Sequence, residues 1–285
     1  MTMVWHNGVR LSSTIGSVSL TDPGLLVGDG AFETLAIYGG RIFALDLHLR
    51  RLSNALTTLE LPPIDQSSLV ACVLEAADSV AQMAVARMRI TVWRSSTELA
   101  VFPATSTVSW SVVVGPGVGP ACGTTNQVTV KVGVSPFLRN ERSPLAGLKS
   151  TAYAENLAAL RHARAAGFDE ALLFNTVGDL AEGTTTNVVV EFPDELVTPA
   201  PSSGALSGVT LAIAREVAQS SGIALRIAQP GELTPSSLVG RPLALLGTLR
   251  NVQSVSHFDA SPVKSGALIL ALAQNFSQLM DRFSH

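Results

Sequence analysis

The chain has 285 residues, of which 47% are hydrophobic and only 14% are charged, and its formal net charge is −3. This balance favours a well-filled core over disorder. It leaves no basic surface to neutralise a phosphate backbone, so nucleic acid is not expected as a partner. The two cysteines, Cys72 and Cys122, are far apart and show no metal-ligand spacing, so neither a disulfide framework nor a metal site is expected.

The beginning of the chain, MTMVWHNGVRLSS, lacks the basic residues and the apolar stretch of a secretory signal. No run of about 18 apolar residues occurs, so we expect no membrane span. A cytoplasmic protein is therefore predicted.

In the N-terminal half, strand-like and helix-like segments alternate. Residues 35–43 (LAIYGGRIF) predict a hairpin that turns at Gly39 and Gly40. Asp46 is expected to cap a helix that runs to about Leu59. Segments rich in β-branched residues predict strands. Three further elements are expected here: a helix over residues 67–83 and strands over residues 85–93 and 107–114.

Glycine and proline alternate in residues 115–123 (GPGVGPACG), a composition that suits a flexible connection and not a helix or a central strand. We therefore predict a smaller N-terminal α/β domain over residues 1–114, a linker over residues 115–123 and a larger C-terminal domain over residues 124–285.

The C-terminal half also interleaves strands and helices, which predicts a second α/β domain and a crevice between the two domains. Such crevices are common places for small-molecule sites. A helix over residues 153–166 is expected to end at Gly167. The other expected elements are strands over residues 127–134, 171–175, 187–191 and 243–246, and helices over residues 208–220 and 266–283.

Lysine is scarce, and Lys149 lies in the almost uncharged stretch SPLAGLKSTAYAENL at the head of a predicted helix. Desolvation and the helix dipole would both lower the pKa of an amine at this position. Carbonyl chemistry requires the free amine. The same stretch also fits an ordinary surface lysine at a helix start.

Glu182 lies in LAEGTTTNVVV, just after a predicted strand. A carboxylate held there could pair with a pyridinium nitrogen and keep it protonated, which makes the ring an electron sink. A loop glutamate in solvent is the alternative.

Several residues could hold a phosphate group. Residues 208–210 (GVT) begin a predicted helix, where backbone N–H groups and the helix dipole favour an anion. Gly247 and Thr248 follow a buried strand, and Arg51 could supply a positive charge. Each of these features is common in proteins when it occurs alone.

Taken together and in this order, six segments resemble the class IV aminotransferases. The resemblance covers nearly the whole chain, from about Asn7 to Val252, and its most specific part is the lysine segment followed by EGTTTN. The segments are GDGAFETL (28–35), HLRRL (48–52), LAGLKSTAYAENLAAL (145–160), DEALLFNTVGDLAEGTTTNVVV (169–190), SGVTLAIAREVA (207–218) and LLGTLRNV (245–252).

The resemblance implies a two-domain fold-type IV enzyme, similar to D-amino acid aminotransferase, that binds pyridoxal 5'-phosphate (PLP) and forms a homodimer. It identifies Lys149 as the lysine that carries the cofactor, Glu182 as the carboxylate at the ring nitrogen and Arg51 as the phosphate-binding arginine. The other residues that it implies are Val209, Thr210, Gly247 and Thr248 at the phosphate, Tyr153 beside the cofactor, and Phe32 and Thr34 on the substrate side.

The family contains aminotransferases, which act on branched-chain amino acids, D-amino acids or amines, and 4-amino-4-deoxychorismate lyase, which makes p-aminobenzoate and pyruvate for folate biosynthesis. Residues 32–34 (FET), 139–140 (RN) and 249–252 (LRNV) are similar to the lyases, and the Arg-x-His pair of the D-amino-acid enzymes does not follow Arg94. We therefore predict the lyase, with an aminotransferase as the alternative and a non-catalytic PLP-binding homologue as a remote alternative.

Two features depart from the lyase pattern. Residues 95–98 are short and acidic where the lyases are rich in glycine and arginine, and Gly247 stands where an asparagine is expected. A dicarboxylic substrate requires cationic partners. The candidates for binding its carboxylates are Arg89, Arg94, Arg139 and Arg250, each of which also fits a surface or strand-edge arginine.

Overall fold

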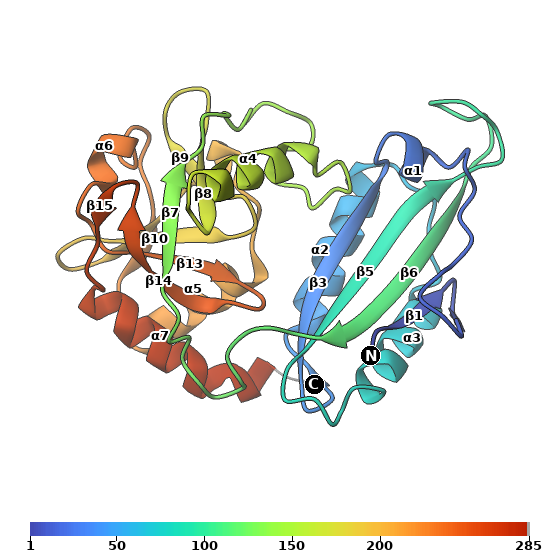
Figure 1. The fold of residues 1–285 in the computed structure, drawn as a ribbon, viewed down its shortest axis with the longest axis horizontal. Coiled ribbons are helices and arrows are strands. Elements are labelled where there is room, and N and C mark those ends of the chain that lie inside the picture. Colours follow the sequence, from blue (N-terminus) through green and yellow to red (C-terminus); the bar gives the residue numbers. More distant parts are fainter. Residues whose placement is uncertain (284–285) are drawn as a thin grey trace. The chain divides into compact units, whose positions relative to one another are not determined.

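The computed structural model describes residues 1–283, and the chain divides into two compact units (Figure 1). The first unit comprises residues 1–122 and the segment Leu148–Tyr153, together with Phe283. The second unit comprises Gly123–Gly147 and Ala154–Arg282. The short segment that contains Lys149 therefore belongs to the first unit, although the residues on both sides of it belong to the second.

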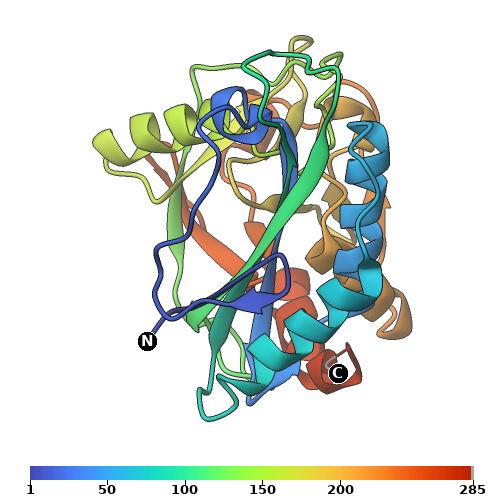
Figure 2. The same cartoon turned by 90° about the vertical axis from the view of Figure 1, so that its right-hand side faces the viewer.

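The first unit is built on an antiparallel six-stranded sheet in the order β2-β1-β6-β5-β3-β4. Helices α2 (Leu45–Thr58) and α3 (Gln66–Asp78) pack on this sheet, and the short helix α1 (Pro23–Leu26) contacts β5 (Figures 1 and 2). The strands are β1 (Met3–His6), β2 (Val9–Arg10), β3 (Gly30–Tyr38), β4 (Arg41–Ile42), β5 (Ala86–Ser95) and β6 (Thr107–Pro116).

The two faces of this sheet differ in character, because successive side chains of a strand point to opposite faces. Met88 and Ile90 of β5 are fully buried in one hydrophobic core with Leu52 of α2 and Val73 of α3. Arg89 lies between these two β5 residues and therefore projects from the face opposite to the core.

The second unit is built on nine strands in the order β12-β11-β10-β13-β14-β7-β8-β9, with β15 paired to β14. These strands are β7 (Val130–Val134), β8 (Glu170–Phe174), β9 (Leu180–Gly183), β10 (Asn187–Glu191), β11 (Leu196–Thr198), β12 (Leu225–Ile227), β13 (Leu243–Gly247), β14 (Asn251–Phe258) and β15 (Ser261–Pro262).

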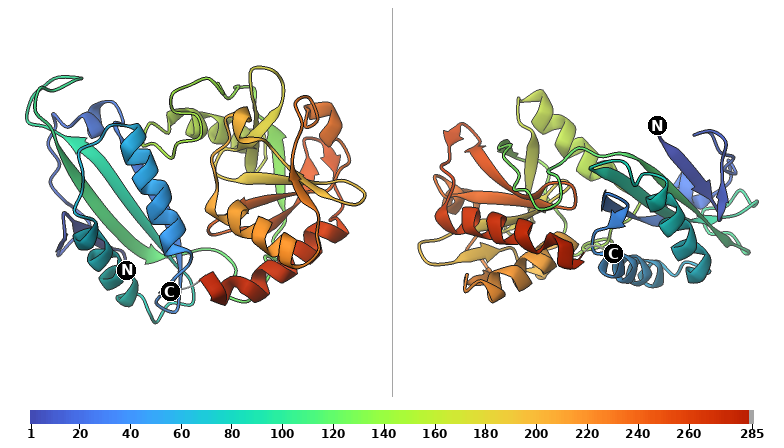
Figure 3. Two further views of the ribbon diagram at one scale, coloured as in Figure 1. Left: turned by 180° about the vertical axis from the view of Figure 1, so that it is seen from behind. Right: turned by 90° about the horizontal axis from the view of Figure 1, so that it is seen from below.

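Helices cover this second sheet. Helix α4 (Ala154–Ala165) packs on β7 and β8, while α5 (Val209–Ser220) and α7 (Ala267–Leu279) lie side by side against β13 and β14 (Figure 3). Strand β8 separates two cores, since Leu172 faces the main core and Leu173 faces α4. The short helices are η1 (Pro201–Ser203), α6 (Pro235–Leu238) and η2 (Met280–Phe283).

Most of the expected elements are present, and the α/β class is confirmed. The hairpin turns at Gly39 and Gly40, which both have positive φ angles and therefore suit glycine. Gly167, with φ of 86°, follows the end of α4 as predicted. Strand β14, which was not expected, has the polar sequence NVQSVSHF and is paired on one side with β13 and on the other with β7.

The prediction that Asp46 caps α2 is wrong. The helix begins at Leu45, and its N-cap is Ala44 with φ of 55°, whose side chain makes no capping hydrogen bond. Asp46 lies instead in the first turn, where its negative charge interacts favourably with the positive end of the helix dipole.

The segment predicted as a linker, residues 115–123, begins inside a strand. Gly115 and Pro116 complete β6 and pair with Arg87 and Ala86 of β5. Proline is tolerated at this position because the strand ends there.

Among residues 1–283, no helix is both long and apolar enough to cross a lipid bilayer. In the same described range, no three His, Cys, Asp or Glu side chains come together in a way that could hold a metal ion.

Candidate functional site

Hydrogen bonds to the start of β3 fix the segment that contains Lys149. The N–H of Phe32 donates to the carbonyl of Lys149 at 2.9 Å, and the N–H of Thr151 donates to the carbonyl of Gly30 at 2.8 Å. A Cβ atom at Gly30 would lie 2.5 Å from the carbonyl oxygen of Val92. Glycine at this position therefore allows the lysine segment, β3 and β5 to approach closely.

The amine of Lys149 lies beside aromatic rings. Its Nζ atom is 4.4 Å from the ring centroid of Phe32 and 5.9 Å from that of Tyr153. The guanidinium carbon of Arg89 lies 3.7 Å from the same Phe32 centroid, and Thr34 pairs with Arg89 across the two strands. The first unit thus brings together five residues that the sequence assigned to the cofactor and the substrate.

Arg89 is a partly buried cation. Its Nε atom donates to Thr91 Oγ1 at 3.1 Å, and no carboxylate among residues 1–283 forms an ion pair with it. Burial lowers the pKa of Arg89, the positive charge of Arg87 lowers it further, and Tyr153 raises it. Since the ordinary pKa of arginine is above ~12, the group stays charged at neutral pH and is suited to bind an anion.

A buried carboxylate holds Arg51 from inside the first unit. Arg51 Nε and Nη2 donate to the two oxygens of Glu33, each at 2.7 Å, and His48 Nδ1 lies 2.7 Å from Glu33 Oε2. Burial raises the pKa of Glu33, but the bonds and charges of Arg51 and His48 outweigh this effect and bring it to about 2. Burial also lowers the pKa of His48, so its neutral ring donates through Nδ1 to the ionised Glu33.

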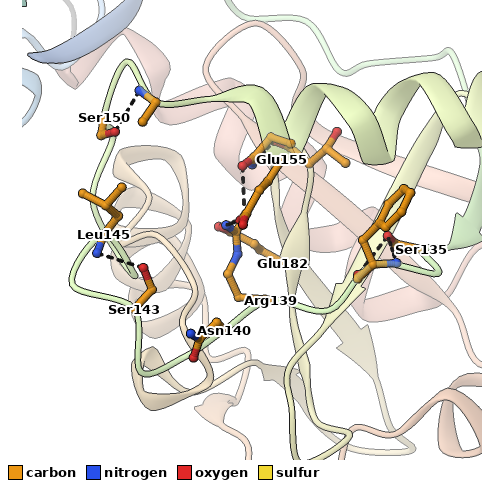
Figure 4. Close-up of polar contacts among 12 residues, drawn as sticks. Ser135, Arg139, Asn140, Ser143, Leu145, Ser150, Glu155 and Glu182 are labelled. Carbon is orange, nitrogen blue, oxygen red and sulfur yellow. Dashed lines mark hydrogen bonds and ion pairs between the residues drawn. The ribbon is translucent and has the colours of Figure 1, made fainter. Parts of the chain in front are cut away.

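Glu182 lies in β9 with its side chain only 10% exposed and faces Arg139 (Figure 4), and both of its oxygens accept hydrogen bonds. Oε1 accepts from Arg139 Nη2 at 3.1 Å, and Oε2 accepts from the backbone N–H of Leu206 at 2.8 Å. A carboxylate can accept about four hydrogen bonds. Glu182, expected just after a strand with a solvent-exposed loop glutamate as the alternative, is a strand residue whose carboxylate is held in one orientation.

The first turn of α5 meets the beginning of β10. The amide oxygen of Asn187 occupies the place that a Cβ at Gly208 would need, and Asn187 Nδ2 donates to the carbonyl of Leu206 at 2.7 Å. The N-cap of α5 is Gly208, which has no side chain to make a capping hydrogen bond. Its first backbone N–H groups, including those of Val209 and Thr210, are therefore suited to bind an anion.

Helix α5 also packs against β13, which ends at Gly247. Thr248 follows in a turn closed by the N–H of Arg250, which donates to the carbonyl of Gly247 at 2.9 Å. A Cβ at Gly247 would lie 3.5 Å from Thr186 Cγ2, and Thr186 Oγ1 is buried with no hydrogen-bond partner within residues 1–283. The residues that the sequence assigned to the phosphate all lie in this unit except Arg51, which belongs to the first.

All three guanidinium nitrogens of Arg94 have polar partners within the first unit. Its Nε lies 2.6 Å from Asp29 Oδ2, and Nη1 donates to Ser106 Oγ at 3.1 Å. Its Nη2 donates to the carbonyls of Leu59 and Glu60. These bonds hold the surrounding loops together and argue against the substrate role expected from the sequence.

Arg250 and Arg139 also have partners inside the second unit. Arg250 lies 3.4 Å from the buried carboxylate of Glu170 and donates to Gln253 at 2.9 Å. Arg139 is paired with Glu182, as described above. These pairings argue against a substrate role for either arginine and leave Arg89 as the candidate without a carboxylate partner in the described residues.

Glu33, Asn187 and Glu170 had no role predicted from the sequence, although the structure places all three next to candidate residues. Glu33 carried a usable signal, since it is a charged residue between Ala31 and Leu35 on the core side of a strand. A charge at such a position must be paired when it is buried. The partners of Asn187 and Glu170 depend on contacts between segments that are distant in the sequence.

The chain is similar in sequence to known enzymes of one family. Residues 30–258 match the family model of the class IV aminotransferases. A bifunctional aminodeoxychorismate lyase / D-amino acid transaminase from Mycobacterium tuberculosis is 30% identical over 70% of this chain and 74% of that protein. A putative branched-chain-amino-acid aminotransferase from Methanocaldococcus jannaschii is 26% identical over 98% of this chain and 97% of that protein.

Solved structures show the same fold. A hypothetical aminotransferase from Mycobacterium tuberculosis, in its PLP-bound form, is similar with a TM-score of 0.84 and 24% identity, over 98% of this chain and 99% of that chain. The branched-chain amino acid aminotransferase from Escherichia coli is similar with a TM-score of 0.85 and 21% identity, over 98% of this chain and 94% of that chain.

Proposed function

Because the chain belongs to the class IV aminotransferases, we propose that it transfers an amino group between an α-amino acid and an α-keto acid. The family depends on PLP, so the chain is a PLP-dependent enzyme. The sequence favoured the lyase reaction over amino transfer. The relative from Methanocaldococcus jannaschii, similar over almost its whole length, supports the alternative instead.

The side chains present fit PLP. Lys149 offers a primary amine beside aromatic rings, which suits the aldehyde of the cofactor. The start of α5, whose N-cap is glycine, and the hydroxyl of Thr186, which has no hydrogen-bond partner in the described residues, suit its phosphate. The ionisable carboxylate of Glu182 suits its ring nitrogen. When bound, PLP supplies a conjugated ring that draws electrons away from the carbon bearing the substrate nitrogen.

Lys149 moves the proton in this proposal. With PLP bound and joined to the substrate amine in place of Lys149, the freed Nζ atom would remove the proton from the substrate carbon that bears nitrogen. It would then deliver a proton to the aldehyde-derived carbon of the cofactor, so that water could release the α-keto acid. The rings of Phe32 and Tyr153 lie beside the amine and border the place where the substrate carbon would sit. Glu182 holds a proton on the ring nitrogen through its negative charge.

The observation that carries the proposal is the shared position of Lys149 and Arg89 at the ring of Phe32. An α-amino acid carries an amine and a carboxylate a few atoms apart. The first unit places a reactive amine and a cation with no carboxylate partner in the described residues around one aromatic side chain. We therefore assign Arg89 to the substrate carboxylate.

A second candidate is the lyase reaction on 4-amino-4-deoxychorismate. It is favoured by the 30% identity to the bifunctional lyase / D-amino acid transaminase. The proton step at Lys149 is common to both reactions, so the same residues would serve either one. They differ in the step that follows. Amino transfer releases an α-keto acid and requires a second keto acid as acceptor, whereas the lyase reaction breaks the bond at the neighbouring carbon and releases p-aminobenzoate and pyruvate.

The test is a product assay on PLP-loaded protein. One series contains L- and D-amino acids with an α-keto acid acceptor, and the other contains 4-amino-4-deoxychorismate. In the first series, we expect the α-keto acid acceptor to be converted to its amino acid. Lys149→Ala should abolish this product, and Lys131→Ala, which alters an exposed lysine, should keep it. p-Aminobenzoate without amino transfer would replace the proposal by the lyase, and a cofactor absorbance that responds to no amine would mean a non-catalytic PLP-binding protein.

We also propose that the chain works as a cytoplasmic homodimer. Large apolar side chains are exposed on the first unit, including Leu26, Leu99 and Phe102, and exposed apolar surface often marks an interface. Light scattering of the purified protein should give twice the mass of the 29.7 kDa chain. A single-chain mass at micromolar concentration would contradict the dimer.

A further inference from the structure

The guanidinium of Arg139 faces the carboxylate of Glu182 instead of solvent (Figure 4). Its Nη2 atom donates to Glu182 Oε1 at 3.1 Å and to Asn156 Oδ1 at 3.3 Å. Asn156 is itself buried and donates through Nδ2 to the carbonyl of Thr184 at 2.7 Å. Arg139 is therefore held next to Glu182, the residue that the proposed function assigns to the ring nitrogen, by a bond to Asn156, which is itself anchored to Thr184.

We propose that Arg139 is a positioning residue that keeps Glu182 ionised, and so keeps the shared proton on the ring nitrogen of the cofactor. This inference rests on the role of Glu182 in the proposed function. A carboxylate and a pyridine nitrogen that share one proton can hold it as a charged pair or as a neutral pair. A fixed positive charge beside the carboxylate stabilises the charged pair.

Burial strengthens this effect. The side chains of Arg139 and Glu182 are 14% and 10% exposed, so solvent screens their charges only weakly. The only other carboxylate paired with Arg139 in the described residues is Glu155, at 3.8 Å and with its side chain 81% exposed. An exposed partner at that distance contributes little. Glu182 is therefore the main counter-charge of Arg139.

The bonding pattern also separates this role from substrate binding. Nη2 already serves both Asn156 and Glu182, and the buried Nε has no hydrogen-bond partner within residues 1–283. A substrate carboxylate on this guanidinium would compete with Glu182 for the same charge. The backbone N–H of Leu206 holds the second oxygen of Glu182, so the carboxylate keeps its orientation while Arg139 sets its charge.

The test compares Arg139→Met, which removes the charge, with Arg139→Lys, which keeps it. Arg142→Met is the matched control, because Arg142 lies nearby in the sequence with its side chain 87% exposed. Each protein is loaded with PLP labelled with ¹⁵N at the ring nitrogen, and the ¹⁵N chemical shift reports whether that nitrogen is protonated. KM and kcat for the amino donor are measured in parallel.

In Arg139→Met, we expect the ¹⁵N shift to move towards the unprotonated position. We also expect kcat to fall by about tenfold or more, as for loss of a hydrogen bond to a charged group, with KM unchanged. Arg139→Lys and Arg142→Met should keep the parental shift. If Arg139→Met does not fold, Arg139→Lys carries the test, and an unprotonated ring in that folded variant would overturn the inference.

A raised KM with an unchanged ¹⁵N shift in Arg139→Met would overturn the inference. It would indicate that Arg139 binds the substrate carboxylate, as expected from the sequence. The chemical shift does not depend on which reaction is catalysed. If the parent transfers no amino group but its ring nitrogen still responds to Arg139→Met, the inference stands and the proposed function fails.

Discussion

Glu33 and Glu182 are buried carboxylates, and each is paired with one arginine from the same unit. In the interior, an unpaired carboxylate would take up a proton, whereas a paired one stays charged. We infer a different role for each ion pair. Glu33 fixes the direction of Arg51, whereas Arg139 sets the charge of Glu182.

At the residue scale, Glu182→Gln should separate cofactor binding from catalysis. Glutamine keeps the size of the side chain but cannot hold a proton on the ring nitrogen by charge. We expect PLP to stay bound while kcat falls by about 10²–10³-fold, the size of effect seen when one preorganised electrostatic contact is removed. Absorbance of the bound cofactor and steady-state rates measure the two quantities, and a near-parental rate would leave Glu182 with a structural role only.

Glu33 should make the stability of the protein sensitive to acid. Its pKa in the folded chain, about 2, lies below the ordinary value of 4.5, so its ionised form stabilises the fold above pH 4.5. This contribution, roughly 3 kcal/mol, is lost as the pH falls from 4.5 towards 2. His48, whose pKa is also lowered, adds a loss in the same direction when the pH falls below 6.5.

Urea unfolding at several pH values measures this effect. Glu33→Gln should be less stable than the parent at pH 7, because Arg51 and His48 lose their charged partner, and should lose less stability between pH 4.5 and pH 2.5. Asp46→Asn alters an exposed carboxylate of α2, the helix that carries Arg51 and His48, and should follow the parent between pH 4.5 and pH 2.5. Parallel pH curves for the parent and Glu33→Gln would refute the assignment.

At the scale of elements, the pairing of the lysine segment with β3 decides where the reactive amine lies. The backbone bonds at Phe32 and Thr151 set the register, and Gly30 permits the close approach. The side chains that surround the amine follow from this register, because Phe32 and Thr34 then project from the same face of β3. A change in packing at Gly30 should therefore act on the site without altering any polar group.

Gly30→Ala should lower both the stability and the affinity for PLP. The new methyl group would lie 2.5 Å from the carbonyl oxygen of Val92 and 3.0 Å from Thr151 Oγ1, so β3 must move relative to β5 and the lysine segment. Gly39→Ala is the control, since it meets nothing within 4 Å and is strained only by its φ of 56°. We expect Gly39→Ala to lower the melting temperature but to keep full PLP loading, and full loading of Gly30→Ala would show that the register does not control the site.

At the scale of the whole molecule, the elements were easier to predict from the sequence than their partners. The hairpin at Gly39 and Gly40 and the stop at Gly167 follow from local conformational preference, and the structure contains both. Strand β9 was missed because it is short and ends in glycine, and pairing with β8 stabilises it. The contact between Arg139 and Glu182 joins residues far apart in the sequence and could not be read from either one alone.

The candidate residues divide in the same way. Lys149 and Glu182 were found because each lies in a distinctive segment, whereas the four arginines had no local signal to separate them. The folded chain separates them, since Arg94 and Arg250 are bonded to their own unit and Arg89 has no carboxylate partner in the described residues. Which of several similar charges is available to a ligand is set by tertiary contacts.

The most direct test of the central claim is a single half-reaction. PLP-loaded protein is mixed with an α-amino acid and no acceptor, and the absorbance of the cofactor and the α-keto acid released are measured together. We predict that one molecule of keto acid is released per active site with a matching change in absorbance. Lys149→Ala should abolish both signals, and Arg89→Met should need a higher amino acid concentration to reach them. No keto acid from any L- or D-amino acid, with the cofactor bound, would contradict amino transfer by this chain.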